Sequence, residues 1–210
     1  MVNTIDGAQR RHLLAEAVWR LILRGGLAAA TVRGVADEAG LSAGSVRHFF
    51  TSQADLHIFA MTELIDTVSA RVATAAEEPD LERRVRAMLE ELLPLTDRSR
   101  SEFSAYLEFV IRSRTDERLR PVTERSVLAV RELLSTVLDG MQQLGLIAPE
   151  LAITAETVRL QGLLDGLTLR LVIAPDTLTV AQARRSVDDH LQALRPAQSR
   201  KQQPTTKASS

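Results

Sequence analysis

The sequence predicts an all-α protein, with an N-terminal three-helix domain that contains a helix-turn-helix and a larger helical domain behind it. Apolar residues recur at helical spacing along almost the whole chain, which indicates about nine helices. No stretch alternates apolar and polar residues for long enough to form a sheet. Glycines and prolines separate the periodic segments, as expected where helices end.

Residues 31–50, TVRGVADEAGLSAGSVRHFF, predict the helix-turn-helix. The first helix has an apolar stripe at positions i, i+3, i+4 and i+7, formed by Val32, Val35, Ala36 and Ala39. Gly40 can end that helix in a left-handed conformation, and Ser42 stands where the next helix needs an N-cap. The second helix has its own stripe of Val46, Phe49 and Phe50. Because a helix held in this way can enter the major groove, the segment predicts a DNA-binding protein.

Helical periodicity and breaker residues place the other helices at about residues 9–24, 52–76, 81–93, 99–114, 122–144, 155–173 and 179–194. The helix at 52–76 is apolar on more than one face, which is typical of a helix that packs against two bodies. We therefore expect a DNA-binding domain at residues 1–55, a ligand-binding and dimerisation domain at 56–195, and a disordered polar tail at 196–210.

Composition excludes several other classes of protein. The chain has no cysteine, so it has neither disulfides nor thiolate metal sites. It has no apolar run of the ~20 residues that a membrane span needs, and no signal-peptide pattern, so we expect a cytoplasmic protein without membrane association. The histidines are scattered, and there is no nucleophile elbow, P-loop or paired-glycine motif. We therefore expect no metal site, no cofactor and no enzymatic activity.

The distribution of charge gives weaker support to DNA binding. The net charge is +1 over residues 1–55, −6 over residues 56–194 and +4 over residues 195–210. The N-terminal domain is thus less basic than a typical DNA-binding footprint. A dimer would double the local field, and a focused basic patch can exist in a nearly neutral domain.

The chain resembles the TetR family of transcriptional repressors over nearly its whole length. The matching N-terminal residues are Thr31-Val32-Arg33, Val35-Ala36, Gly40-Leu41-Ser42, Gly44, His48, Phe50, Ser52 and Leu56. The C-terminal part resembles the betaine-regulator-like subgroup through Leu92-Leu93-Pro94-Leu95, Thr115-Asp116 and Leu164-Asp165-Gly166-Leu167. The resemblance implies a homodimer with two DNA-reading domains, and a C-terminal domain whose small-molecule ligand releases the operator.

Three positions depart from the family pattern where the family commonly touches DNA. Arg47 stands in place of a usual tyrosine, Phe49 in place of a histidine or tyrosine, and Gln53 in place of a lysine. Phe49 cannot hydrogen-bond a phosphate and Gln53 has no charge. Fewer neutralised phosphates predict a weaker dependence of DNA affinity on salt than is usual in the family.

Residues in and around the helix-turn-helix are the candidates for DNA contact. They are Thr31, Arg33, Ser42, Ala43, Gly44, Ser45, Arg47, His48 and Gln53. Arg47 lies off the apolar stripe and is expected either to read guanine or to bind a phosphate. The alternative is a solvated surface arginine. Ser42 is expected to cap its helix whether or not it also contacts DNA.

A cluster of aromatic residues is the candidate ligand pocket. Phe103, Tyr106 and Phe109 stand at i, i+3 and i+6 of one helix and would form an apolar wall with a single hydroxyl. The further candidates are the apolar residues Met61, Ile65 and Met88 and the polar residues Gln161 and Asp165. The alternative for the aromatic face is ordinary core packing.

Two glycines inside one helix suggest a dimer interface. Gly162 and Gly166 each cost ~1 kcal/mol relative to alanine in a helix, so a packing reason is expected. Together with the apolar residues of the last helix, they predict a four-helix interface formed by Gly162, Gly166, Val180, Ala183, Val187 and Leu191. Packing within one subunit is the alternative.

These features predict a ligand-responsive transcriptional repressor. It would bind a pseudo-palindromic double-stranded DNA operator as a homodimer, with recognition helices about 34–36 Å apart, and a small-molecule inducer would release it. The alternative is an all-helical small-molecule-binding protein with weak or no sequence-specific DNA binding. A helical enzyme is a third class, and the sequence shows no convergent acid–base set to support it.

Overall fold

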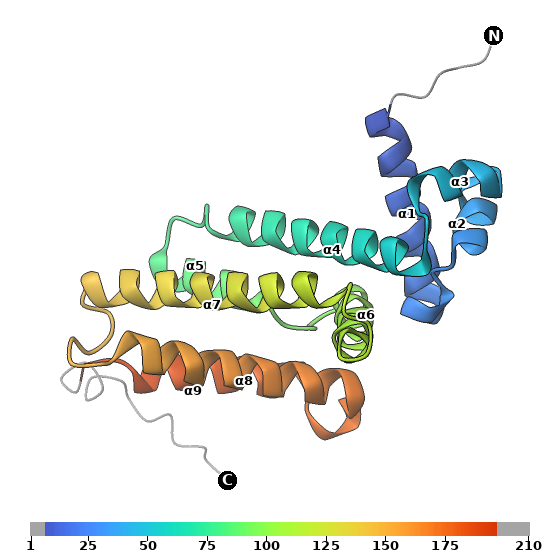
Figure 1. Cartoon of the computed structure of the whole chain (residues 1–210). Coiled ribbons are helices and arrows are strands. Elements are labelled where there is room, and N and C mark those ends of the chain that lie inside the picture. Colours follow the sequence, from blue (N-terminus) through green and yellow to red (C-terminus); the bar gives the residue numbers. More distant parts are fainter. Residues whose placement is uncertain (1–6, 197–210) are drawn as a thin grey trace. The chain divides into compact units, whose positions relative to one another are not determined.

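The structure is a computed structural model that describes residues 7–196 (Figure 1). These residues form nine α-helices and two short 3-10 helices, with no strand among them. The elements are α1 (Gly7–Gly25), η1 (Leu27–Ala29), α2 (Val32–Ala39), α3 (Ala43–Phe49), α4 (Gln53–Ala75), α5 (Leu81–Glu90), α6 (Asp97–Ser113), α7 (Arg120–Gln143), α8 (Ile153–Ile173), η2 (Pro175–Thr177) and α9 (Val180–Ala193). The predicted all-α fold is confirmed.

Short polar side chains begin most of these helices. Thr31 accepts a hydrogen bond from the Gly34 amide at the start of α2, and Ser42 accepts one from the Ser45 amide at the start of α3. Ser52 and Asp55 form the predicted capping box of α4. Each contact satisfies an amide that has no partner inside its own helix.

Some helix boundaries differ from the prediction for identifiable reasons. A second capping box, of Thr96 with Ser99, starts α6 two residues earlier than expected. Pro121 lies within the first turn of α7, where the amide has no partner inside the helix, so the proline does not interrupt the helix. The helix α5 ends at Glu90, and the amides of Leu92 and Leu93 then bond three residues back in a tight turn before Pro94.

The helix-turn-helix forms as predicted. Gly40 ends α2 with φ of 65°, the left-handed conformation that glycine adopts without steric cost. Its amide donates to the carbonyl groups of Ala36 and Asp37. Val35, Ala36 and Val46 are fully buried where α2 and α3 pack together. We call α1–α3 the reading head.

The chain divides into two compact units, residues 1–127 and 128–210, and the division falls inside α7. In the first unit α4 and α6 complete the core of the reading head, with side chains such as Leu56, Met61 and Phe109. The expected division at residue 55 is therefore not the division between compact units. The head has too little apolar surface of its own and shares a core with the helices behind it.

The second unit is built on α8 and α9, which pack against each other. Leu160, Leu164, Leu167 and Leu171 form the buried face of α8. The Ala148 amide donates to the Leu194 carbonyl at 2.8 Å and ties the loop before α8 to the end of α9. No helix in residues 7–196 is long and apolar enough to cross a membrane. The predicted polar tail lies outside the described residues, apart from Pro196.

Candidate functional site

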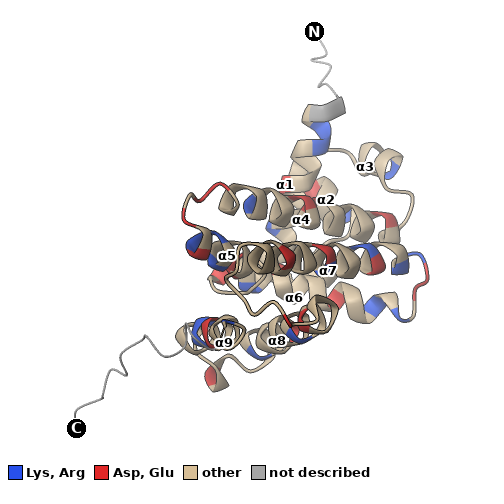
Figure 2. Cartoon of the chain, turned by 90° about the vertical axis from the view of Figure 1, so that its left-hand side faces the viewer, with Lys and Arg blue, Asp and Glu red and all other residues tan. Residues whose placement is uncertain are grey.

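The N-terminal part of α3 forms an exposed face of small residues. Ser42, Ala43 and Gly44 are exposed, and Arg47 and His48 continue the exposed face one turn later. The helix carries basic residues and no acidic one (Figure 2). The opposite side holds the buried Val46, so packing on the head fixes which side of α3 points outward. Such a face can approach the floor of a DNA groove closely.

The arginines of the reading head fall into two groups. Glu38 binds both Arg20, at 2.7 Å, and Arg24, and these guanidinium groups hold the pKa of Glu38 below its ordinary value. Arg11 pairs with Glu63 at 2.7 Å and lies over the ring of Phe59. These ion pairs neutralise part of the head's positive charge within the protein.

Arg33 and Arg47 belong to the second group, because neither has an ion pair among the residues that the structure describes. Both side chains are exposed. They are therefore available for an anionic partner, and contact of either residue with DNA stays a prediction. Ser42 caps α3, as predicted, and Thr31 caps α2. Contact of Thr31, Ser42 and Ser45 with DNA stays a prediction.

The Gln53 side chain is exposed and also has partners within the protein, and its contact with DNA stays a prediction. Its Nε2 donates to the carbonyl of Ala30 and lies 2.9 Å from Nε2 of His57. The amide is thus used inside the protein, between the start of α4 and the turn before α2. Without a charge, Gln53 has no strong reason to face a phosphate, and an internal carbonyl is the better partner.

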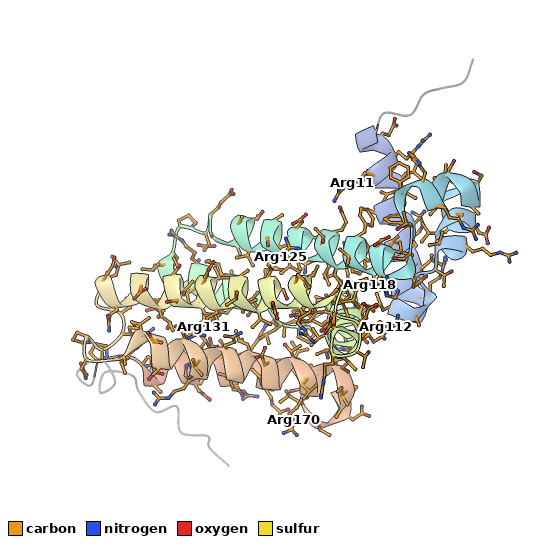
Figure 3. All side chains as sticks on the ribbon, viewed as in Figure 1. Arg11, Arg112, Arg118, Arg125, Arg131 and Arg170 are labelled. Carbon is orange, nitrogen blue, oxygen red and sulfur yellow. The ribbon has the colours of Figure 1, made fainter. Side chains whose placement is uncertain are left out.

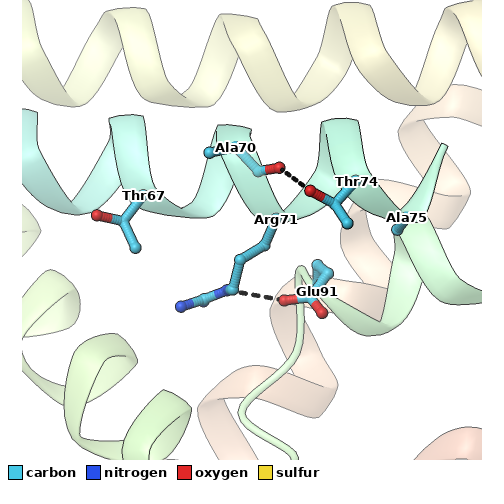
Figure 4. A pocket seen from close by; sticks show the side chains of 6 residues that line it. All are labelled: Thr67, Ala70, Arg71, Thr74, Ala75 and Glu91. Atoms are coloured by element: carbon cyan, nitrogen blue, oxygen red, sulfur yellow. Dashed lines mark hydrogen bonds and ion pairs between the residues drawn. The ribbon is translucent and has the colours of Figure 1, made fainter. Parts of the chain in front are cut away.

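A hollow of about 520 Å³ lies along the C-terminal half of α4 (Figure 4). Its lining residues are Thr67, Ala70, Arg71, Thr74, Ala75 and Glu91. We call it the Arg71 hollow. The hydroxyls of Thr67 and Thr74 donate to the carbonyl groups of Glu63 and Ala70, so toward a ligand they offer only acceptor lone pairs.

Arg71 is held by two carboxylates. Its Nε donates to Glu91 at 2.8 Å, and its two Nη atoms donate to the two oxygens of Glu102, at 3.3 and 2.9 Å. Glu102 is almost completely buried, with 4% of its side chain exposed, and Arg98 pairs with it at 3.0 Å. Burial lowers the pKa of Arg71, but Glu102 and Glu91 outweigh that effect and raise it, so the guanidinium stays charged.

None of the predicted ligand-binding residues lines this hollow. Met61 and Phe109 are completely buried in the core that α4 and α6 share with the reading head, and their contact with a ligand stays a prediction. The burial of Phe109 agrees with the core-packing alternative. Tyr106 is half-buried, and its hydroxyl lies 2.9 Å from Oγ of Ser126. That hydroxyl is bound within the protein.

The remaining candidates of that set are Ile65, Met88, Phe103, Gln161 and Asp165. Ile65, Met88, Phe103 and Gln161 are half-buried and Asp165 is exposed. Their contact with a ligand stays a prediction.

Sequence reasoning missed Arg71, Glu91 and Glu102. A signal for Glu102 was present, because this acidic residue lies on the same helical face as Ala105, Phe109 and Ser113. A carboxylate on a buried face needs a cationic partner. Nothing in the spacing of the sequence identified Arg71 as that partner, because it is 31 residues away along the chain.

The outer face of α8 is a stripe of small and apolar residues. Gly162 and Gly166 are exposed, and a Cβ atom placed on either would meet nothing within 4 Å, so the alternative of packing within one subunit is wrong for both glycines. The stripe also contains large apolar side chains: Val158 is 55% exposed, Leu169 47% and Ile173 67%.

The contribution predicted for α9 needs a correction. Ala183 and Val187 are already buried within the single chain and have no side-chain surface left for a partner. Val180 and Leu191 are half-buried and stay candidates. The apolar stripe of α9 was interpreted as one surface, but its central residues are needed for packing within the chain.

A helix-turn-helix with an exposed basic recognition helix, joined to a helical domain with a surface hollow, defines a DNA-binding transcriptional regulator with a ligand-binding domain. Comparison with known proteins gives the family. Residues 14–58 match the model of the bacterial regulatory proteins of the tetR family. Residues 62–196 match the C-terminal domain of BetI-type transcriptional repressors. The chain belongs to the TetR family, with a C-terminal domain of the BetI type.

Individual relatives agree with this assignment. The regulator PksA of Bacillus subtilis is 29% identical over 195 residues, covering 92% of this chain and 94% of that protein. The regulator BetI 1 of Chromohalobacter salexigens is 30% identical over 190 residues, covering 87% and 89%. A regulator from Saccharomonospora viridis, solved in complex with choline, has the same fold with a TM-score of 0.77 at 22% identity, covering 87% of this chain and 95% of that one.

Family and relatives confirm a transcriptional regulator, and not an enzyme. Members of the family bind DNA and small-molecule ligands and act as dimers.

Proposed function

We propose that this protein is a homodimeric repressor that binds a pseudo-palindromic operator through α3 and leaves it when a small molecule enters the Arg71 hollow. The observation that carries the proposal is the exposed face of α3, where small residues are followed by the unpaired Arg47. An arginine at this place can donate two parallel hydrogen bonds to guanine O6 and N7 or bind a phosphate.

Three further groups would position the head on the duplex. Arg33 lies in the first turn of α2, and His48 follows Arg47 on α3. The free amides at the start of α3 suit a phosphate, because helix N-termini carry partial positive charge. Backbone contacts of this kind fix the register of the head, while Arg47 supplies base discrimination.

The Arg71 hollow lies within the part of the chain that matches the BetI-type C-terminal domain, which supports its use for the effector. The hollow has a volume of about 520 Å³ and is open to solvent. Choline is bound in the Saccharomonospora viridis regulator, which makes small polar molecules the first effectors to try. A ligand shifts the protein between its DNA-binding state and its released state only if it binds one of them more tightly. A near-complete switch takes a difference of ~5.5 kcal/mol in binding free energy between the two states.

The stripe on α8 supports a homodimer. Exposed large apolar side chains on both sides of two exposed glycines form a surface where a second helix can approach closely. A two-fold axis would pair this stripe with its own copy, and Val180 and Leu191 of α9 would extend the contact.

Selection from a random duplex library tests the function. The purified protein is incubated with the library at low salt, and the retained duplexes are sequenced. Enrichment of an inverted repeat with half-sites about one helical turn apart is the expected result. If a well-folded dimer enriches nothing, repressor activity is overturned in favour of the second candidate, a small-molecule-binding protein without sequence-specific DNA binding. The inward Gln53 amide and the apolar Phe49 are the observations that favour that candidate.

A further inference from the structure

One exposed aromatic residue lies on the reading head, at the end of the recognition helix. Phe49 is 40% exposed, and no other phenylalanine, tyrosine or tryptophan in residues 7–196 belongs to the exposed class. It is the last residue of α3. Burial in the core therefore does not account for this ring, because a large part of its surface faces outward.

The neighbouring phenylalanine is the one that fills the core. Phe50 is 5% exposed, and its ring packs against the ring of Phe59 at a centroid distance of 5.1 Å. Arg11 lies over the ring of Phe59, and Figure 3 shows it on the side of α1 that faces α4. The apolar contacts of this part of the head are thus made by position 50, and the aromatic ring at position 49 needs another explanation.

The helical turn places Phe49 at one edge of the outward face of α3. Val46 is buried, and at about 100° per residue Phe49 lies about 60° from it on one side and Arg47 about 100° from it on the other. Gly44 and His48, both exposed, lie between these two edges. The outward face therefore has a guanidinium group at one edge and an apolar ring at the other.

The His48 ring restrains the ring of Phe49. The two rings meet edge to face, with their centroids 6.1 Å apart and their planes at 87°. This arrangement is attractive because the positive edge of one aromatic ring meets the negative face of the other. Phe49 thus presents a defined apolar surface instead of rotating freely in solvent.

The length of α3 allows residues at both of its ends to reach base edges. The helix has 7 residues, which at about 1.5 Å per residue is about 10 Å. The major groove of B-DNA is about 12 Å wide, so the whole helix fits within it. Phe49 has no group that could hydrogen-bond a base or a phosphate. The apolar group that base edges present in the major groove is the C5-methyl of thymine.

From these observations we infer that Phe49 is a specificity-determining residue, which selects a thymine in each operator half-site by packing its ring against the C5-methyl group. The inference rests on the proposed function, because it requires α3 to bind an operator. It adds an apolar requirement at one edge of α3 to the polar contact proposed for Arg47 at the other.

The test removes the methyl group from the DNA and the ring from the protein. It uses the full chain and the inverted repeat selected by the wild type. Each thymine of one half-site is replaced in turn by deoxyuridine, which keeps every hydrogen-bonding group of thymine and lacks only its methyl. At one of these positions the wild type should bind roughly three- to fivefold more weakly, as expected for the loss of one buried methyl group.

The two changes should not add. Phe49→Ala should weaken binding to the unmodified operator by roughly fivefold, and deoxyuridine at the sensitive position should then have no further effect. Phe49→Leu keeps an apolar side chain and should retain most of the deoxyuridine penalty. Leu23→Ala removes an apolar side chain of α1 that is 44% exposed, and this matched control should behave like the wild type. Circular dichroism and urea unfolding establish that each variant is folded.

Repeating the library selection with Phe49→Ala gives a second readout, independent of modified bases. The preference for thymine should disappear at one position of each half-site and remain at all other positions. A preference for thymine that is the same in the wild type and in Phe49→Ala would overturn the inference.

The remaining outcomes also separate the inference from the proposed function. A deoxyuridine penalty of equal size in the wild type and in Phe49→Ala would assign the methyl contact to another residue, such as the exposed Ala43, and would overturn the inference. Weaker binding by Phe49→Ala without a deoxyuridine penalty at any thymine would place the ring against the sugar-phosphate backbone and overturn it as well. In both cases an operator exists and the repressor function stands. Absence of any enriched operator would overturn the repressor function, and base reading by Phe49 with it.

Discussion

Nδ1 of His57 accepts a hydrogen bond from Nη1 of Arg112 over 3.2 Å, in a site where the imidazole ring is 1% exposed. Burial and the Arg112 charge lower the pKa of His57 to about 4, although the carbonyl groups of Ala30 and Leu27 and the carboxylate of Asp116 act in the opposite direction. A neutral ring with an unprotonated Nδ1 is needed for this bond, because a protonated ring would present an N–H donor to Arg112, which is itself a donor.

This pKa predicts a stability loss in mild acid. In the unfolded chain His57 binds a proton near pH 6.5, and in the folded protein only near pH 4, so protons favour unfolding between these values. The stability that comes from the lowered pKa of His57 is complete above about pH 6.5 and is lost as the pH falls toward 4. Its loss cannot exceed ~1.4 kcal/mol per pH unit for one proton. Urea unfolding followed by Trp19 fluorescence from pH 7.5 to 4.5 measures it.

The control for this prediction is His57→Gln, compared with the wild type at each pH. His190 also has a pKa lowered by burial, and the lowered pKa values of Glu38 and Asp55 act at more acidic pH. These groups are present in both proteins and cancel in the difference. Equal pH dependence of the two proteins would show that His57 is not buried as a neutral group.

Arg47→Ala should weaken operator binding by roughly tenfold or more, because a bidentate contact to guanine is worth about 1–3 kcal/mol. If Arg47 reads a base, the loss should be confined to operators that carry guanine at one position. If it binds a phosphate, all sequences should weaken alike and the salt slope should fall by about one. Binding titrations on a set of single-position operator variants distinguish these two roles. An affinity equal to that of an Arg131→Ala control would remove Arg47 from the interface.

Tyr106→Phe should lower the free energy of unfolding by about 1 kcal/mol, the usual worth of one internal hydrogen bond. Ser126 already donates to the Thr123 carbonyl at 2.8 Å, so the tyrosine hydroxyl is the donor in the 2.9 Å contact. Urea unfolding of Tyr106→Phe, Ser126→Ala and the double variant measures the effect. The losses in the free energy of unfolding of the two single variants should not add in the double variant, because both single variants remove the same bond. Full additivity would rule that bond out as the cause.

Leu169→Asp should dissociate the proposed homodimer. The substitution places a charge in the centre of the exposed apolar stripe of α8, where a two-fold contact would bury it twice. Sedimentation of the variant should show a folded monomer at concentrations where the wild type is a dimer. Ile111→Asp is the matched control, since Ile111 is a 66% exposed apolar residue on α6. A dimeric Leu169→Asp protein would place the interface elsewhere.

Local sequence signals were sufficient for the helices and for the reading head. Capping residues such as Ser42 and Ser52, the left-handed Gly40, and the stripe through Val35 and Val46 act within one or two helical turns. Interactions of such short range depend little on the rest of the chain, so periodicity and caps predicted them correctly. The boundary errors at Pro121 and at the Thr96 cap were of two residues, and the error at the end of α5 was of three.

Contacts between distant residues were decided by the tertiary structure alone. The sequence placed an apolar face on residues 103–109, yet folding put Phe109 into a shared core and bound the Tyr106 hydroxyl to Ser126. It gave no sign that Arg71 would meet Glu102, or that Glu108 would reach Leu27 across 81 residues. An apolar stripe has the same sequence pattern whether it faces a core, a ligand or a second subunit. In the same way, the sequence around a charged residue does not show which residue it pairs with. Which of these neighbours each side chain meets depends on how the helices pack, and that packing is a property of the whole fold.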